Sequence, residues 1–547
     1  MFDSRNGVHG HLVARWIFLR ALAAIYFSAF YSLLFQIKGL IGPQGILPAH
    51  DYLAAVARAY PSMKLWFAPT LLWLSSDAHA VMIVTWVGLL ASIVAFLNLW
   101  PRLSFFICFV SFISFVSAAQ DFSNYQSDGM LLEAGFISLF FVPRGLLPGL
   151  GAATPPSRAS LLLLQWEWFR IYFESGLVKL LSGDRQWRTL SAMDEYYQNG
   201  PLPTWIGWYT QHLPHWFHTA SAAGTLVMEL GIVWMLFLPR RVRIVCFFIV
   251  TPWEIGVILT ANYTFLNYLV LALGFLLLDD RFLLQFVPAR HRRLESQDAQ
   301  RQRENADMDA PASASTLKMI EEEPDSDGPE ASPSGVRRLQ GHLHAIRFAI
   351  SVVMLTWIFY DTTAEMLLIP FHTLPLPTTP ITLLEPFRVA NQYGLFAVMT
   401  NGRYEIEFQG SNDGQSWTPY LFRNKPQALN EPPRIYAPYQ PRFDWNLWFA
   451  SLGDWHQNEM VPLTEERLLE NEKDVLGLFR ANPFLRAPPR YVRAVLWQYW
   501  FTTRAEKQAT GNWWRREYLG LYAPELTKSS DGHVAVVQWP EELPPHD

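Results

Sequence analysis

Four charged side chains lie inside one strongly apolar segment of the chain. Residues 159–181 are long enough to cross the ~30 Å hydrocarbon core of a bilayer at ~1.5 Å per residue, yet they include Glu167, Arg170, Glu174 and Lys179. On an α-helix the first three of these point within about 60° of one another. A charged stripe in such a segment is typical either of ion pairs that join helices or of the wall of a polar cavity.

Two further glutamates, Glu133 and Glu254, lie in other apolar segments. Charged groups inside a membrane usually face the interior of a helix bundle and pair with one another. We therefore predict one intramembrane polar cluster. Within it, Glu167 or Glu174 is the expected partner of Arg170, since each lies about one turn away on the same face. Lys179 points away from this stripe, and one interpretation is that it extends to the membrane surface. The predicted cluster comprises Glu133, Glu167, Arg170, Glu174 and Glu254.

The composition indicates a membrane protein. The 547 residues are 50% hydrophobic and 15% aromatic, and only 17% are charged, a profile typical of integral membrane proteins. Lysine and arginine occur in short runs beside apolar segments, which argues against a basic nucleic-acid-binding surface. The two cysteines, Cys108 and Cys246, both lie in apolar runs, which argues against a disulfide framework or a cysteine zinc site. We find no motif that predicts a metal ion, a cofactor or a lipase nucleophile.

About nine apolar segments are long enough to cross a membrane. Two of them are short and are also compatible with re-entrant pieces. With the N-terminus in the cytoplasm, the basic runs "PRL", "PRG", "PRRVR" and "PARHRR" all fall on the cytoplasmic side, as the positive-inside rule requires. The segments lie near residues 12–35, 79–99, 103–119, 129–143, 159–181, 221–238, 242–261, 263–278 and 342–360.

Changes in polarity divide the chain into four parts. Residues 1–288 are predicted to form a transmembrane helical bundle, and residues 289–341, polar and rich in Pro and Ser, a disordered cytoplasmic linker. A last transmembrane helix at 342–360 then places residues 385–530 outside the cytoplasm. The alternation in "YEIEF", followed by an Asn-Asp-Gly turn, predicts a β-hairpin. The predicted fold is a multi-pass α-helical membrane bundle plus a C-terminal β-rich, sandwich-like extracytoplasmic domain.

An aromatic run in this last part allows two interpretations. The first is that it forms the core of the domain, with Arg442 in a buried ion pair to one of two nearby aspartates. The second is a surface that binds a client protein, because Trp and Arg dominate binding hot spots. The core interpretation is favoured. The residues concerned are Arg442, Asp444, Trp445, Trp448, Asp454 and Trp455.

Several long stretches closely resemble the lipase maturation factor family, in matching order from Arg15 to Pro524. Among them are "DGMLLEAGF", "FLNYLVLALGFLLLDD", "ANQYGLFAVMTNGRYEIEFQGSNDGQSW" and "WWRREYLGLYAPEL". The resemblance implies a multi-pass membrane protein whose C-terminal domain lies on the exported side. In animals, such proteins reside in the endoplasmic reticulum membrane and help dimeric secreted lipases to reach an active fold. The chain lacks the luminal cysteines expected of the animal members, which favours a bacterial relative in an inner membrane.

A shorter resemblance covers only the membrane part. "LFQIKGLIGPQGILP" and "SGLVKLLSGDRQW" are similar to the transmembrane domain of vitamin K-dependent gamma-carboxylase. There a lysine in a Gly-x-x-Lys-Leu context acts as the base toward a reduced quinone, and Lys179 falls on that position. The alternative function is therefore a carboxylase-like membrane enzyme with a lipid-soluble cofactor. Because the first resemblance spans the whole length, it favours a maturation factor that is not an enzyme, with the bilayer and exported clients such as lipases as partners.

Overall fold

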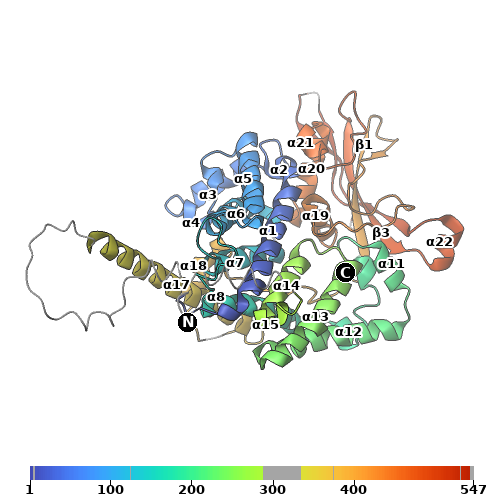
Figure 1. Ribbon diagram of the computed structural model, residues 1–547. Helices are drawn as coiled ribbons and strands as arrows, with labels where there is room; N and C mark the ends of the chain where they lie inside the picture. The colour runs from blue at the N-terminus through green and yellow to red at the C-terminus, as the bar shows by residue number, and fades with distance from the viewer. Residues whose placement is uncertain (4–6, 124, 287–333, 374, 530, 542–547) are drawn as a thin grey trace, which may run out of the picture.

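The computed structural model describes residues 1–3, 7–123, 125–286, 334–373, 375–529 and 531–541. They form a helical bundle and a C-terminal sheet region that lie against each other (Figure 1). In this view the N-terminus lies near the lower end of the bundle and the sheet lies at the upper end. The main helices of the bundle are α1 (Leu12–Leu34), α5 (Ala78–Phe96), α6 (Pro101–Val116), α7 (Gln126–Phe141), α8 (Arg158–Leu181), α12 (His215–Leu230), α13 (Arg240–Thr260) and α14 (Leu266–Gly274).

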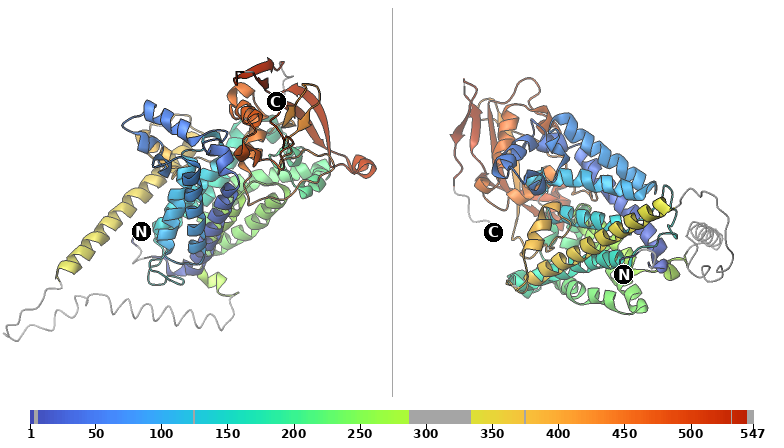
Figure 2. Two further views of the ribbon diagram at one scale, coloured as in Figure 1. Left: turned by 90° about the horizontal axis from the view of Figure 1, so that it is seen from above. Right: turned by 90° about the vertical axis from the view of Figure 1, so that its left-hand side faces the viewer.

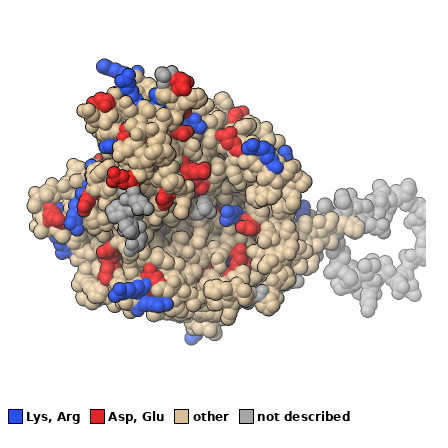
Figure 3. Space-filling model, turned by 180° about the vertical axis from the view of Figure 1, so that it is seen from behind, with Lys and Arg blue, Asp and Glu red and all other residues tan. Residues whose placement is uncertain are grey.

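Several helical segments of the described chain are suited to crossing a membrane. Five are both long and apolar enough, and two more are apolar but shorter. Helix α8 has 24 residues but carries its charged stripe, and α7 has only 16. A membrane-type domain is therefore confirmed, but nine crossings are not. Figure 3 shows that uncharged side chains form most of the face seen from behind. The five segments are His9–Leu34, Ala78–Phe96, His215–Phe237, Arg240–Thr260 and Ala345–Leu368, and the two shorter ones are Pro101–Val116 and Leu266–Leu277.

Helix α1 packs closely on α5 and α7 because glycines lie at the points of contact. A Cβ atom added to Gly88 of α5 would overlap the ring of Phe30, and one added to Gly135 of α7 would overlap the hydroxyl of Tyr26. Small residues at helix interfaces allow backbones to approach in this way. Both aromatic side chains of α1 are consequently buried.

The basic junctions that the structure describes gather at the end of the bundle away from the sheet. The guanidinium of Arg15 donates to three carbonyl oxygens of the connection after α7, at 2.7, 2.8 and 2.9 Å. Arg240, at the start of α13, pairs with Asp279, and the neighbouring Asp280 accepts the backbone N–H of Leu12 at 2.7 Å. The runs "PRG" and "PRRVR" therefore lie beside the start of α1. The run "PARHRR" lies outside the described residues.

The C-terminal region contains one antiparallel sheet in the order β2-β1-β3-β5-β6, with β4 also paired to β3. The predicted hairpin is confirmed, since Gln409 of β1 pairs with Pro419 of β2. The strands are β1 (Arg403–Ser411), β2 (Thr418–Pro419), β3 (Tyr491–Phe501), β4 (Trp514–Leu521), β5 (Glu525–Lys528) and β6 (Val534–Gln538). The helices of this region are α19 (Arg442–Ala450), α20 (Met460–Leu469), α21 (Lys473–Leu476) and α22 (Arg504–Thr510).

The predicted sandwich is not found among the described residues, because helices occupy the place of a second sheet. Alternate residues of β1, Tyr404, Ile406 and Phe408, belong to the apolar core, and α19 and α20 pack against this part of the sheet. Alternation along one strand indicates only that one face is buried. It does not indicate whether strands or helices cover that face.

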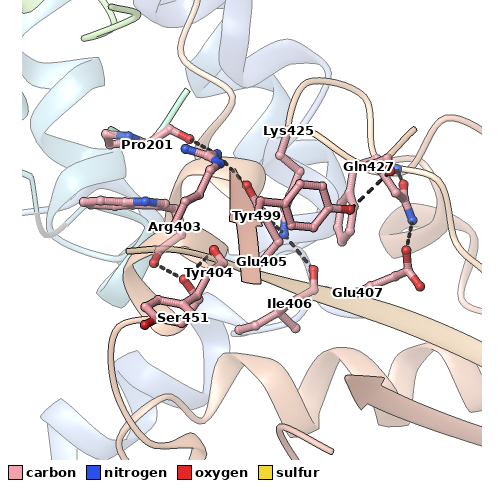
Figure 4. Close-up of polar contacts among 12 residues, drawn as sticks. Pro201, Arg403, Tyr404, Glu405, Ile406, Glu407, Lys425, Gln427, Ser451 and Tyr499 are labelled. Atoms are coloured by element: carbon pink, nitrogen blue, oxygen red, sulfur yellow. Dashed lines mark hydrogen bonds and ion pairs between the residues drawn. The ribbon is translucent and has the colours of Figure 1, made fainter. Parts of the chain in front are cut away.

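The other face of β1 is buried although it is charged (Figure 4). Glu405 lies between Arg403, with which it pairs, and the Nζ of Lys425, at 2.8 Å. Arg403 also donates to the carbonyl oxygens of Gln198, at 2.9 Å, and Pro201, at 3.0 Å, in the connection between α8 and α12. A buried arginine therefore joins the sheet to the bundle.

Helix α17 (Ser334–Leu368) leads from the bundle to the sheet region. Residues 289–333 of the predicted linker lie outside the described residues, but residues 334–341 are helical. The predicted span at 342–360 lies within this helix. Figure 2 shows that the N-terminal part of α17 diverges from the other helices. Nearer its C-terminus, Thr362 accepts a hydrogen bond from Trp166 of α8 at 3.2 Å.

Short helices complete both connections at the sheet end of the bundle. The connection after α1 contains three of them, and the connection after α8 contains three more. The helices of the first connection join the apolar core that continues from the bundle into the C-terminal region, whereas those of the second connection contribute Trp187, Tyr196 and Trp208 to a separate core cluster. The short helices are α2 (Ile37–Ile41), α3 (Ala49–Ala59), α4 (Lys64–Phe67), α9 (Arg185–Arg188), α10 (Tyr196–Asn199) and α11 (Trp205–Gln211), with α15 (Asp280–Leu283) and α18 (Thr379–Leu384) elsewhere.

Candidate functional site

The charged stripe of α8 meets a glutamate of α7 inside the bundle. Arg170 forms an ion pair with Glu133, and its Nη1 lies 3.6 Å from the Oε1 of Glu174. All three side chains are at most 1% exposed. The expected partner Glu174 is therefore present, but the closer partner, Glu133, comes from the neighbouring helix. Spacing in the sequence shows which acidic residues share a face of one helix. It does not show which acidic residue of a neighbouring helix lies opposite that face.

The same charges bind the backbone of residues 391–393, which we call the anchor segment. Arg170 donates to the carbonyl oxygen of Asn391 at 2.7 Å, and the N–H of Asn391 donates to Glu133 at 3.1 Å. The N–H of Tyr393 donates to Glu174 at 2.6 Å. Two glutamates and one arginine thus satisfy backbone groups that follow α17 and precede the sheet.

Glu167 is fully buried, and in the described part of the chain its carboxylate forms no hydrogen bond to the anchor segment. Among the described residues it forms no ion pair within 4 Å, although Glu133 and Arg170 are the nearest charges that act on it. Of the two alternatives expected for the partner of Arg170 on its own helix, Glu174 is therefore the one that the structure places beside it.

Lys179 and Glu254 belong to a second site, a cavity of about 120 Å³. The ammonium of Lys179 donates to both oxygens of Glu229, at 2.7 and 2.9 Å, and to the Oγ of Ser175 at 2.5 Å. Tyr172 donates to Glu254 at 2.6 Å. The predicted single cluster is therefore divided into two. The remaining walls of the cavity are mainly aliphatic and aromatic, and the aromatic residues among them are Trp187, Tyr196, Trp253, Tyr263, Tyr393 and Phe396.

Sequence reasoning missed Glu229, the partner of Lys179. The available signal was a lone acid in the apolar segment 221–238. Lys179 is 4% exposed, so it does not extend to a surface. It is held between α8 and α12 by a buried ion pair.

The charged side chains that line this cavity form hydrogen bonds with neighbouring side chains of the cavity wall. The Nζ of Lys179 donates hydrogen bonds to Glu229 and to Ser175, so the lysine is bound by neighbouring side chains on α8 and α12. Cavities that bind drug-sized ligands are ~300–1,000 Å³, whereas this one is about 120 Å³. In this conformation it accommodates several water molecules or a very small ligand.

The aromatic run lies mainly at the interface between the bundle and the C-terminal region. Arg442 forms a two-pronged ion pair with Asp128 of α7, at 2.7 and 2.8 Å, and is fully buried. Trp448 donates to the carbonyl oxygen of Asn199 at 3.0 Å, and the ring of Trp445 lies 6.3 Å from that of Tyr263. These contacts reach residues far apart in the sequence.

Two predictions for this run are therefore corrected: the client-binding surface and the ion-pair partner of Arg442. Arg442, Trp445 and Trp448 are buried, so they do not offer a free surface to a client. Arg442 pairs with Asp128 and not with Asp444 or Asp454. Asp444 accepts from Asn424 at 2.8 Å, and burial raises the pKa of its carboxyl to about 6. Trp455 is half-buried, and its ring stacks on His456 at 3.8 Å.

The pair of Arg170 and Glu133 can be tested by double substitution. Arg170→Met is expected to lower the free energy of unfolding by ~3–5 kcal/mol, because it leaves buried glutamates without a positive charge. Adding Glu133→Leu should recover much of this loss, whereas adding Glu167→Leu should recover less. Thermal unfolding of the purified protein in detergent measures both effects.

A matched control is the exposed pair of Arg480 and Glu431, whose closest atoms lie 2.8 Å apart. Arg480→Met should cost at most ~1 kcal/mol, since an exposed ion pair contributes little. An unchanged unfolding temperature for Arg170→Met would contradict a structural role for this arginine.

Comparison with known proteins identifies the family. Residues 13–285 match the model of the lipase maturation factor transmembrane domain, and residues 389–524 match that of the lipase maturation factor C-terminal domain. Lipase maturation factor 2 of Gallus gallus is 31% identical, covering 97% of this chain and 84% of the relative. Lipase maturation factor 1 of Bos taurus is 30% identical, covering 97% and 92%. No solved structure matches the chain. The chain, a membrane protein with an anchored C-terminal region, belongs to the lipase maturation factor family.

Proposed function

We propose that this chain assists the folding or maturation of exported proteins, with lipases as the first candidates. The relatives are named lipase maturation factors, and they match across both regions. The observation that carries the proposal is the buried contact between the bundle and the C-terminal region, made by Arg170, Arg403 and Arg442. This contact holds a folded, mostly β region at one end of a membrane domain, where it meets chains that have just been exported.

We further propose that the sheet lies on the exported side, with nine crossings and a cytoplasmic N-terminus. The membrane is the bacterial inner membrane or, in a eukaryote, that of the endoplasmic reticulum. Support comes from the basic junctions, since Arg15 and Arg240 lie at the end of the bundle away from the sheet. Cytoplasmic loops carry an excess of Lys and Arg.

Reporter fusions test this orientation. Alkaline phosphatase fused after Pro375 should be active, and fusions at Arg240 or Ser313 should be inactive, because the enzyme requires export. The activity of each fusion is normalised to its abundance. Active fusions at Arg240 or Ser313 would overturn the orientation.

Outer strands of the sheet offer the apolar surface that a client requires. Tyr518 on β4 is 48% exposed, Val537 on β6 is 50% exposed, and Trp539 just beyond β6 is 62% exposed. Among the described strands, β6 pairs only with β5, so its other edge is open to an extended chain. Exposed strand edges are recurrent binding sites for peptides. We propose this edge, and not Trp445 or Trp448, as the client-binding surface.

The proposed surface is tested by combining Val537→Asp with Trp539→Ser. Secreted activity of a co-expressed lipase, relative to the abundance of the variant, should fall by about tenfold, which corresponds to ~1.4 kcal/mol of binding. Leu485→Asp is the control, since Leu485 is also exposed but lies away from β6 in the sequence. Equal losses for both variants, or no loss for either, would refute this surface.

The second candidate function is a carboxylase-like enzyme with Lys179 as its base. In its favour, Lys179 does line a buried cavity. Against it, Glu229 and Ser175 accept hydrogen bonds from the Nζ of Lys179, so this nitrogen is already engaged by the chain's own side chains. The balance favours the maturation role, in which Lys179 joins α8 to α12.

A paired substitution separates these two roles. Lys179→Met should lower abundance, because Glu229 is left buried without its partner. Lys179→Met with Glu229→Leu should recover abundance and, in the maturation role, secreted lipase activity as well. A double variant that is abundant but inactive would instead support the enzyme, since the general base would be missing.

A further inference from the structure

Residues 60–74, which we call the apolar loop, expose large apolar side chains at the sheet end of the bundle. The loop lies in the connection after α1 and contains α4, and Figure 1 shows α4 on the side of α5 that faces away from the strands. Six of its large apolar side chains are at least 40% exposed, and Leu74 reaches 88%. A patch of this kind usually marks a site of contact with a membrane or with another protein. The six side chains are Tyr60, Met63, Leu65, Phe67, Leu71 and Leu74.

Hydrogen bonds hold the loop beside the ends of two apolar helices. The Oγ1 of Thr70 donates to the carbonyl oxygen of Ser114 at 2.8 Å, and the N–H of Leu71 donates to the Oγ of Ser114 at 3.0 Å. Ser114 lies in the last turn of α6. Asp77, just beyond the loop, is the N-cap of α5, which is long and apolar enough to cross a membrane. The loop therefore lies at the level where α5 enters the bilayer.

The composition of the loop fits the boundary between lipid and water. Lys64 is its only charged residue, and the Nζ of this lysine lies 5.1 Å from the centre of the Trp73 ring. Tryptophan and tyrosine are enriched at the level of lipid headgroups. A lysine at this level extends its charge towards the headgroups while its stem remains in contact with apolar groups.

The exposed apolar surface also continues from the loop onto α5. Ile83 is 61% exposed and Leu90 is 55% exposed, and on a helix that crosses the membrane such side chains face the acyl chains. A protein bound to the loop would have to share this surface with lipid, whereas the bilayer covers both parts at once. Continuity with the lipid-facing side of α5 therefore favours lipid as the partner of the loop.

We propose that the apolar loop lies in the headgroup region of the leaflet on the sheet side, with its exposed side chains directed into the upper part of the acyl chains. The loop attaches to the membrane without crossing it, since α4 has only four residues and a spanning helix requires ~20. The ring of Trp66 also packs edge-to-face on Phe387, with centroids 4.7 Å apart, and Phe387 shortly precedes the anchor segment. The attachment thus supports the chain that leads to the anchor segment. The proposal is independent of the maturation role.

Spin labels on introduced cysteines test the depth of the loop. The full chain carries Leu65→Cys or Leu74→Cys in vesicles of phosphatidylcholine, and the unsubstituted chain measures background labelling, because both native cysteines are fully buried. Oxygen concentrates among acyl chains, and a water-soluble nickel complex does not enter them. The ratio of oxygen to nickel collisions at both loop positions should exceed that at Leu485→Cys by about tenfold, since moving a polar complex out of water costs more than the ~1.4 kcal/mol that this factor requires. Leu485 is the matched control, because it is 85% exposed in the sheet region.

A label at Ile83→Cys on α5 provides the reference value for the acyl chains. The ratios at Leu65 and Leu74 should lie between those at Ile83 and Leu485. A ratio at both loop positions equal to that at Leu485 would place the loop in water and overturn the proposal. A ratio equal to that at Ile83 would place it in the hydrocarbon core, which also contradicts the headgroup position. If both reagents were excluded from the loop, a protein and not lipid would cover it, and the assignment to lipid would be wrong.

Discussion

The arrangement of this protein depends on one buried charge, the guanidinium of Arg170. Removing an arginine from water costs several kcal/mol, and the cost is offset only where opposite charges and hydrogen-bond acceptors lie close to it. Here Glu133 and Glu174 supply the negative charge, and the anchor segment supplies a carbonyl oxygen and two N–H groups. The bundle therefore lacks part of its own core until the C-terminal region is in place. The charges serve to attach one region to the other.

Two further arginines extend this attachment along the interface. Arg442 enters the bundle from α19 to reach Asp128, and Arg403 reaches from β1 to the connection after α8. Tyr393 links the two buried sites, since its N–H is bound by Glu174 and it also lines the cavity of Lys179. A displacement of the anchor segment would thus disturb both sites, which is the physical requirement for coupling between them.

The sequence was sufficient for features that depend on local pattern. Apolar length and basic junctions predicted a membrane bundle, and period-two alternation predicted the hairpin of β1 and β2. The resemblance predicted the family. The sequence was insufficient wherever the ion-pair partner of a residue lies far away in the chain. The partners that it did not indicate are Glu133 for Arg170, Glu229 for Lys179, and Asp128 for Arg442, which is 314 residues away. The predicted sandwich was wrong for a related reason. The alternation in β1 indicates that one face of the strand is buried, but it does not indicate that helices cover that face.

The attachment also sets an order of events during synthesis. Asn391 is made 221 residues after Arg170, so at ~5–20 residues per second α8 waits about 10–45 seconds for its last partner. During that interval Glu133 and Glu174 must hold the guanidinium alone, and the groups that later receive the backbone must remain hydrated or transiently paired. A nascent chain interrupted between these two points would therefore carry an incomplete helix core, which gives quality-control proteases a window in which to recognise it.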